Sequence, residues 1–161
     1  MIKDLIALDN SSKVWIYPAS REISYDELDE MRPMIFNFLD QWTAHNQSLI
    51  TYGNIFHRRF LGIFVDETVA GASGCSIDAS VHFIKDLGSK YGIDFFDRQK
   101  VQFMIDDEVK DFSLSDLKHS AEENELTEES LFIDNLVKDK DSFLNKWIIP
   151  VQDTWAYRFM K

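Results

Sequence analysis

The stretch that decides the fold is residues 49–65, which read Leu-Ile-Thr-Tyr-Gly-Asn-Ile-Phe-His-Arg-Arg-Phe-Leu-Gly-Ile-Phe-Val. Both ends of this stretch, Leu49–Tyr52 and Phe60–Val65, are rich in β-branched and aromatic residues, which favour strands. The turn formers Gly53 and Asn54 lie between the two ends. The stretch therefore predicts an antiparallel hairpin joined near Gly53–Asn54.

A strand and a helix are predicted on the N-terminal side of this hairpin. Lys13–Pro18 is rich in strand formers and is ended by its proline. Ser24 and Glu27 form a capping box, which predicts a helix start. An apolar stripe at helical spacing follows: Leu28, Met31, Ile35, Phe38, Leu39 and Trp42. Pro33 lies inside this helix and predicts either a kink or the start of a second helix.

A second helix and a fourth strand are predicted on the C-terminal side. The helix carries Ile77, Val81, Ile84, Leu87 and Tyr91 on one face and ends at Gly92; the strand is Lys100–Ile105. The order β-α-β-β-α-β predicts an α+β fold with a ferredoxin-like core over residues 12–105. Residues 106–161 are expected to form an acidic C-terminal α/β extension that docks on this core, making 1–161 a single domain.

The charge and cysteine content exclude several classes of protein. The net charge of −11, with no run of basic residues, argues against nucleic-acid binding. No apolar stretch reaches the ~20 residues of a membrane helix, and no signal peptide is evident at the start. A single cysteine, Cys75, permits no internal disulfide or multi-thiolate zinc site. We expect a cytoplasmic protein without cofactor or bound metal, and the sequence leaves its oligomeric state open.

The segment 71–76, Gly-Ala-Ser-Gly-Cys-Ser, is the strongest candidate site in the sequence. Gly71, Gly74, Ser73 and Ser76 just before a helix are typical of an anion-binding loop, to which Arg59 could contribute charge. The helix field would also stabilise a thiolate at Cys75, which makes it a candidate nucleophile. The alternative is structural: a tight connection in which Ser76 caps the helix and Cys75 is a small apolar residue.

Three stretches resemble a family of short bacterial proteins whose members commonly carry the label "ABC transporter ATPase". They are Phe38–His45, Val69–Val81 and Tyr91–Arg98, and the likeness extends to Trp155. The resemblance implies no characterised chemistry. The label implies a P-loop ATPase, but the chain contains neither a Walker loop nor the signature Leu-Ser-Gly-Gly-Gln. We therefore predict that the protein is not a P-loop ATPase.

Three functions remain as hypotheses. The first is a binding or regulatory module that recognises a small anion or a carboxylate at 71–76. The second is a small hydrolase or transferase that uses Cys75, assisted by Ser76 or a histidine. The third is an interaction domain that binds a protein partner through its acidic C-terminal third. An enzyme normally shows a clearer group of acid, base and nucleophile, so the sequence favours a non-catalytic function.

Overall fold

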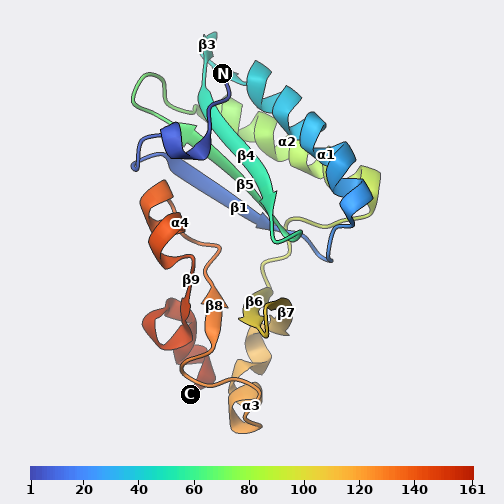
Figure 1. Cartoon of the computed structure of the whole chain (residues 1–161), viewed down its shortest axis with the longest axis vertical. Helices are drawn as coiled ribbons and strands as arrows, with labels where there is room; N and C mark the ends of the chain where they lie inside the picture. The colour runs from blue at the N-terminus through green and yellow to red at the C-terminus, as the bar shows by residue number, and fades with distance from the viewer.

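The computed structural model describes residues 1–161 and contains two antiparallel sheets arranged one above the other along the long axis (Figure 1). The first sheet has the order β1-β5-β4, with β1 (Lys13–Pro18), β4 (Ile50–Phe56) and β5 (Phe60–Asp66). The second has the order β7-β6-β8-β9, with β6 (Lys100–Ile105), β7 (Glu108–Ser113), β8 (Leu131–Ile133) and β9 (Ile148–Pro150). A separate short hairpin joins β2 (Thr43–Ala44) and β3 (Gln47–Ser48). The predicted α+β class is confirmed.

The first sheet contains three of the four strands that the ferredoxin-like prediction requires. β1 and β4 both run antiparallel to β5, which lies between them, and α1 (Tyr25–Gln41) connects them. The fourth strand, β6, does not join this sheet. It pairs instead with β7 and β8 in the second sheet. The four-stranded ferredoxin-like core is therefore wrong, and its boundary near residue 105 falls inside the second sheet.

A local turn explains why β6 leaves the first sheet. Asp106 and Asp107 both have left-handed backbone angles, with φ of 52° and 61°. A two-residue turn of this kind matches the twist of a tight hairpin. It folds β7 back along β6, while β8 pairs with the other edge of β6. With both of its edges paired, β6 cannot also extend the first sheet.

The hairpin of the first sheet turns at a different place from the predicted one. Its tight turn contains His57 and Arg58, whose φ angles are 51° and 56°. Gly53 and Asn54 lie inside β4. A Cβ at Gly53 would come within 2.6 Å of Leu39 Cδ1, so this glycine marks the close approach of α1 rather than a turn.

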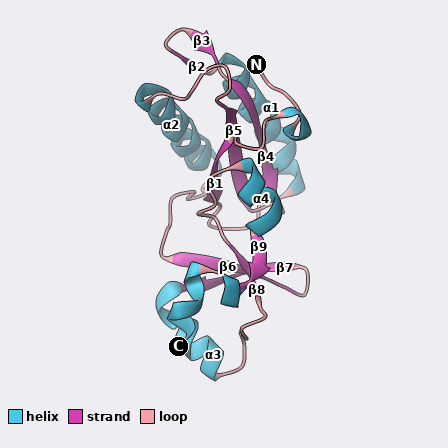
Figure 2. Ribbon diagram, turned by 90° about the vertical axis from the view of Figure 1, so that its left-hand side faces the viewer, coloured by secondary structure: helices cyan, strands magenta, loops and turns pink.

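Both faces of β5 are buried. Leu61, Ile63 and Val65 pack toward α1 and α2 (Gly74–Tyr91), whereas Phe60 and Phe64 pack against the segment of α4 (Lys140–Lys146). Figure 2 shows α4 on the opposite side of the first sheet from α2. Phe143 and Trp147, from the C-terminal part of the chain, complete this second core. A single strand thus organises two hydrophobic layers.

The predicted signals for the helix ends are largely confirmed. Ser24 and Glu27 form the capping box of α1, which continues through Pro33 as one helix. Gly92 ends α2 in the left-handed conformation, with φ of 64°. The start of α2 was placed too late, because its N-cap is Ser73 and Ser76 is the partner that completes the cap.

The second sheet has its own hydrophobic core. Phe103 and Phe132 pack there against Leu117 of α3 (Leu117–Glu122) and against the C-terminal residues Val151 and Ala156. Short 3-10 turns complete the chain at Leu5–Ala7, Leu114–Asp116, Val151–Asp153 and Trp155–Met160. None of the helices combines the length and apolar character needed to cross a bilayer.

Candidate functional site

The two serines of the segment 71–76 accept hydrogen bonds from each other's amides. Ser73 Oγ accepts from the Ser76 amide, and Ser76 Oγ accepts from the Ser73 amide at 2.7 Å. The Ala72 amide donates to Glu67 Oε2 at 2.9 Å. A carboxylate of the protein therefore lies beside the residue that precedes the N-cap of α2, close to where an external anion was predicted. This geometry favours the structural interpretation of the segment.

Cys75 lies in the first turn of α2 and is exposed. Its Sγ forms no hydrogen bond with another group of the protein. His82 is on the same helix, but seven residues along a helix correspond to a rise of about 10 Å. His57 lies in the β4–β5 turn and His119 lies on α3, whereas His45 lies in the turn of the separate β2–β3 hairpin, which contacts α2. No hydrogen bond joins the Cys75 thiol to a histidine, so the structure shows no bonded thiol–base pair of the kind that nucleophilic catalysis uses.

Arg59 does not lie near the segment 71–76. It precedes β5, whereas the segment follows the other end of that strand, about 20 Å away at the rise of an extended chain. Its guanidinium is buried and pairs with Asp111 at 2.9 Å. It also donates to the Ala19 carbonyl oxygen. The structure therefore assigns Arg59 to the junction between the two sheets.

A chain of hydrogen bonds extends this junction. Gln102 donates to Asp111 and accepts from Asn135, whose own side-chain oxygen accepts from the Trp147 indole. Gln102 is only 3% exposed, and both its amide nitrogen and its amide oxygen take part in this chain of hydrogen bonds. These hydrogen bonds hold the turn at residues 134–137 against both sheets. That turn forms one wall of a cavity.

We call this cavity the β1 cleft; its volume is about 480 Å³. It is bounded by the outer edge of β1, the start of α2, Arg98 and the turn leading to α4. Its lining residues are Lys13, Val14, Trp15, Ile16, Tyr17, Ile77, Arg98, Asn135, Leu136, Val137 and Lys138. Ligand sites are typically apolar hollows of about 300–1,000 Å³ with a few polar groups, and the β1 cleft has this character.

The charged residues of the β1 cleft all have the same sign. Lys13, Arg98 and Lys138 line it, and no acidic residue does. Lys13 forms an ion pair with Glu67, whereas Arg98 and Lys138 form none. An adjoining cavity of about 430 Å³ shares Arg98 and adds both Lys100 and the acidic Asp97. In a chain of net charge −11, this is an unusual concentration of basic side chains.

Two aromatic donors in the β1 cleft lack partners within the protein. Tyr17 is 6% exposed, and its hydroxyl forms no hydrogen bond. Burial raises its pKa, so the hydroxyl remains a donor at neutral pH. The indoles of Trp42, Trp147 and Trp155 each donate to a protein oxygen, whereas that of Trp15 does not. The cleft thus offers donors together with positive charge.

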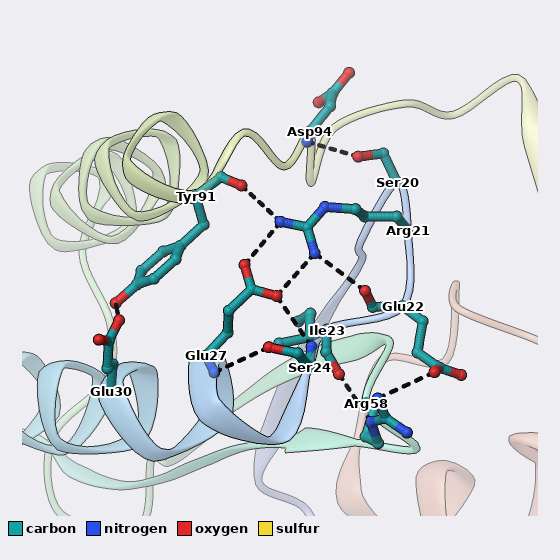
Figure 3. Close-up of polar contacts among 10 residues, drawn as sticks. All are labelled: Ser20, Arg21, Glu22, Ile23, Ser24, Glu27, Glu30, Arg58, Tyr91 and Asp94. Atoms are coloured by element: carbon teal, nitrogen blue, oxygen red, sulfur yellow. Dashed lines mark hydrogen bonds and ion pairs between the residues drawn. The ribbon is translucent and has the colours of Figure 1, made fainter.

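A separate polar cluster at the start of α1 is structural (Figure 3). Arg21 binds Glu27 through both terminal nitrogens and also donates to the Tyr91 carbonyl. The Tyr91 hydroxyl donates to Glu30, and burial together with this bond raises its pKa to about 12. Such a hydroxyl stays protonated at neutral pH. The cluster clamps the start of α1 to the end of α2.

The acidic pairs Asp66–Glu67 and Asp106–Asp107 have structural roles as well. Asp66 accepts hydrogen bonds from Thr68 and from the Asp9 amide, and Asp106–Asp107 form the β6–β7 turn. No group of three or more potential metal-ligating side chains lies close together.

Sequence reasoning missed the β1 cleft for a physical reason. Lys13, Arg98 and Lys138 are far apart in the sequence and form no run or motif. Only the departure of β6 from the first sheet leaves the edge of β1 open to them. The chain matches no protein-family model, and no curated protein or solved structure is detectably similar to it. The resemblance to the short bacterial family stays a prediction.

Proposed function

We propose that this protein is a non-catalytic binding module and that the β1 cleft binds an anionic ligand. The observation that carries the proposal is the all-basic charge of this cleft in a strongly acidic chain. The acidic remainder of the protein repels anions in general, so the cleft is the place where an anion is favoured.

The aromatic and apolar lining adds a second requirement on the ligand. Trp15, Leu136 and Ile77 line the same space as the cations, and Leu136 is 55% exposed. A ligand with an apolar part therefore gains from burial as well as from charge. A carboxylate on an apolar scaffold fits this combination better than an inorganic ion.

The contacts in the structure give less support to the three hypotheses drawn from the sequence. The Ala72 amide, next to the helix start at 71–76, already donates to the Glu67 carboxylate, and no hydrogen bond joins Cys75 to a base. The acidic C-terminal third remains a candidate surface for a basic partner, yet no feature of its contacts singles out a site. The small-anion function predicted from the sequence is thus retained, but its location moves to the β1 cleft.

The proposal is tested by thermal unfolding in the presence of citrate, phenylsuccinate and phosphate at constant ionic strength. A ligand that binds only the native state raises the unfolding midpoint as its concentration rises. We expect the largest shift with phenylsuccinate and a loss of most of that shift in Arg98→Ala and Lys138→Ala.

Lys118→Ala is the matched control, because it removes an equal charge from an exposed position on α3. It should respond to ligand as the wild type does. Equal responses in all the variants, or shifts lost only on substitution within residues 71–76, would contradict the proposed site.

A further inference from the structure

The geometry points to a more specific ligand: we propose that the open edge of β1 accepts an extended acidic segment of a partner protein as an added strand. This inference rests on the proposed function, since it names the ligand class of the same cleft. It adds a requirement that simple anion binding does not have, namely backbone hydrogen bonds to β1.

The outward backbone groups of β1 follow from its register. Ala19 N–H donates to the Arg59 carbonyl, in line with the pairing of Tyr17 with Leu61 and of Trp15 with Ile63. Odd-numbered residues of β1 therefore bond to β5, and even-numbered residues point outward. The outward Val14 amide donates to the Lys138 carbonyl at 3.0 Å. Ile16 is the next outward residue, and its amide has no such partner.

Ile16 therefore presents a free donor and a free acceptor to the β1 cleft. The residue is only 3% exposed, and it lines the cavity. Buried backbone amides are nearly always paired, so an amide that faces a cavity without a partner in the protein is available to a hydrogen-bonding ligand. Pro18, which has no amide hydrogen, ends the usable edge. One residue of an added strand could exchange both of its backbone bonds with Ile16.

The other edge of the same sheet is filled by the chain itself. On the outer edge of β4, the Thr51 amide donates to the Met1 carbonyl, and the Lys3 amide donates to the Thr51 carbonyl. The residues around Ile2 thus lie beside β4 as a short parallel strand. Proteins normally cover or block such edges. The β1 edge is covered from Ser12 to Val14, where the Lys140 amide donates to the Ser12 carbonyl and the Val14 amide donates to the Lys138 carbonyl, and it is uncovered at Ile16.

The charge of the cleft identifies the occupant. A strand added beside Ile16 would lie in the cavity that Arg98 and Lys138 also line, so acidic side chains would complement them. A second copy of this protein, pairing β1 with β1, would instead bring two sets of the same cations together. Like charges that face each other across an interface cost affinity. The partner is therefore an acidic extended segment of another protein.

The test uses an acetylated and amidated peptide of alternating glutamate and valine, carrying a fluorophore for anisotropy. We expect saturable binding to the full-length protein that weakens as salt is raised, because exposed charges are screened. Lys138→Ala and Arg98→Ala should each weaken binding by about tenfold, and Lys118→Ala should leave it unchanged.

A second series of peptides isolates the backbone bonds. Each peptide of this series has one backbone amide methylated. The peptide whose methyl group removes the hydrogen bond to Ile16 should bind about tenfold more weakly than the unmethylated peptide. A peptide of alternating lysine and valine is the charge-reversed control and should not bind.

Two results would overturn strand addition while leaving anion binding intact. The first is that all the methylated peptides bind the wild type equally well, while the Arg98 and Lys138 variants bind them more weakly. The other is a thermal shift with phenylsuccinate but no binding of any peptide. Sedimentation that shows a stable dimer, broken by Ile16→Pro while the monomer stays folded by circular dichroism, would mean that a second copy occupies the edge.

Discussion

At the residue scale, two glycines of α2 show how local contacts decide what a position tolerates. A Cβ at Gly74 would meet no atom within 4 Å, whereas a Cβ at Gly88 would collide with the carbonyl oxygen of Ile93. Both positions are helical, so intrinsic propensity favours alanine at each. The difference between them lies entirely in packing.

We predict that Gly74→Ala stabilises the protein by about 0.5–1 kcal/mol, the usual gain of alanine over glycine in a helix. Gly88→Ala should destabilise it by about 1–3 kcal/mol, because the backbone at Ile93 must move to admit the methyl group. Urea unfolding of the two variants measures both values. Equal effects in the two variants would show that α2 and the chain after it are not packed as described.

At the element scale, the clamp between α1 and α2 makes stability depend on pH. The Arg21 guanidinium, together with the Ser24 amide, lowers the pKa of Glu27 to about 2. A free glutamate has a pKa of about 4.3, so the folded state favours the ionised form. Its stabilising contribution is present above the unfolded pKa and is lost as the pH falls toward the folded pKa.

We predict that Glu27→Gln removes part of the acid dependence of stability between about pH 4.5 and pH 2. The free energy of unfolding, measured by urea titration at several pH values, should fall less steeply in the variant than in the wild type. Asp26→Asn is a suitable control, since Asp26 also lies in the first turn of α1 but has no basic partner. Parallel curves for wild type and Glu27→Gln would contradict the clamp.

Local signals in the sequence predicted the elements well, because their causes are local. The capping box at Ser24, the strand ended by Pro18 and the left-handed stop at Gly92 each depend on a few neighbouring residues. The hairpin turn was misplaced because Gly53 serves packing against α1, a long-range contact that the sequence does not display. His57 and Arg58 adopt a turn conformation that glycine or asparagine usually supplies.

At the scale of the whole molecule, the partition of strands between sheets could not be predicted. A β-strand pattern shows that Lys100–Ile105 is extended, but it does not show which edge it joins. The tight turn at Asp106–Asp107 decides this by pairing β6 with β7. The candidate site follows from that choice. Lys13, Arg98 and Lys138 meet only because the edge of β1 is left open.

The junction between the sheets depends on the Arg59–Asp111 ion pair. Asp111→Ala would leave the buried guanidinium of Arg59 without its carboxylate and would also break the bond from Gln102. We predict a loss of about 2–3 kcal/mol, somewhat less than for a fully buried pair because the Asp111 side chain is 33% exposed. A double-mutant cycle with Arg59→Met measures the coupling by urea unfolding. Additive effects of the two substitutions would show that the pair does not join the sheets.

The central claim is that the β1 cleft, rather than the segment 71–76, is the binding site. Its most direct test is a titration of isotopically labelled protein with phenylsuccinate and with the glutamate–valine peptide, followed by amide chemical shifts. We predict changes at Trp15–Tyr17, at Arg98 and along residues 135–138, with the Ile16 amide moving most on addition of peptide. Changes confined to residues 71–76, or no saturable change with either ligand, would contradict it.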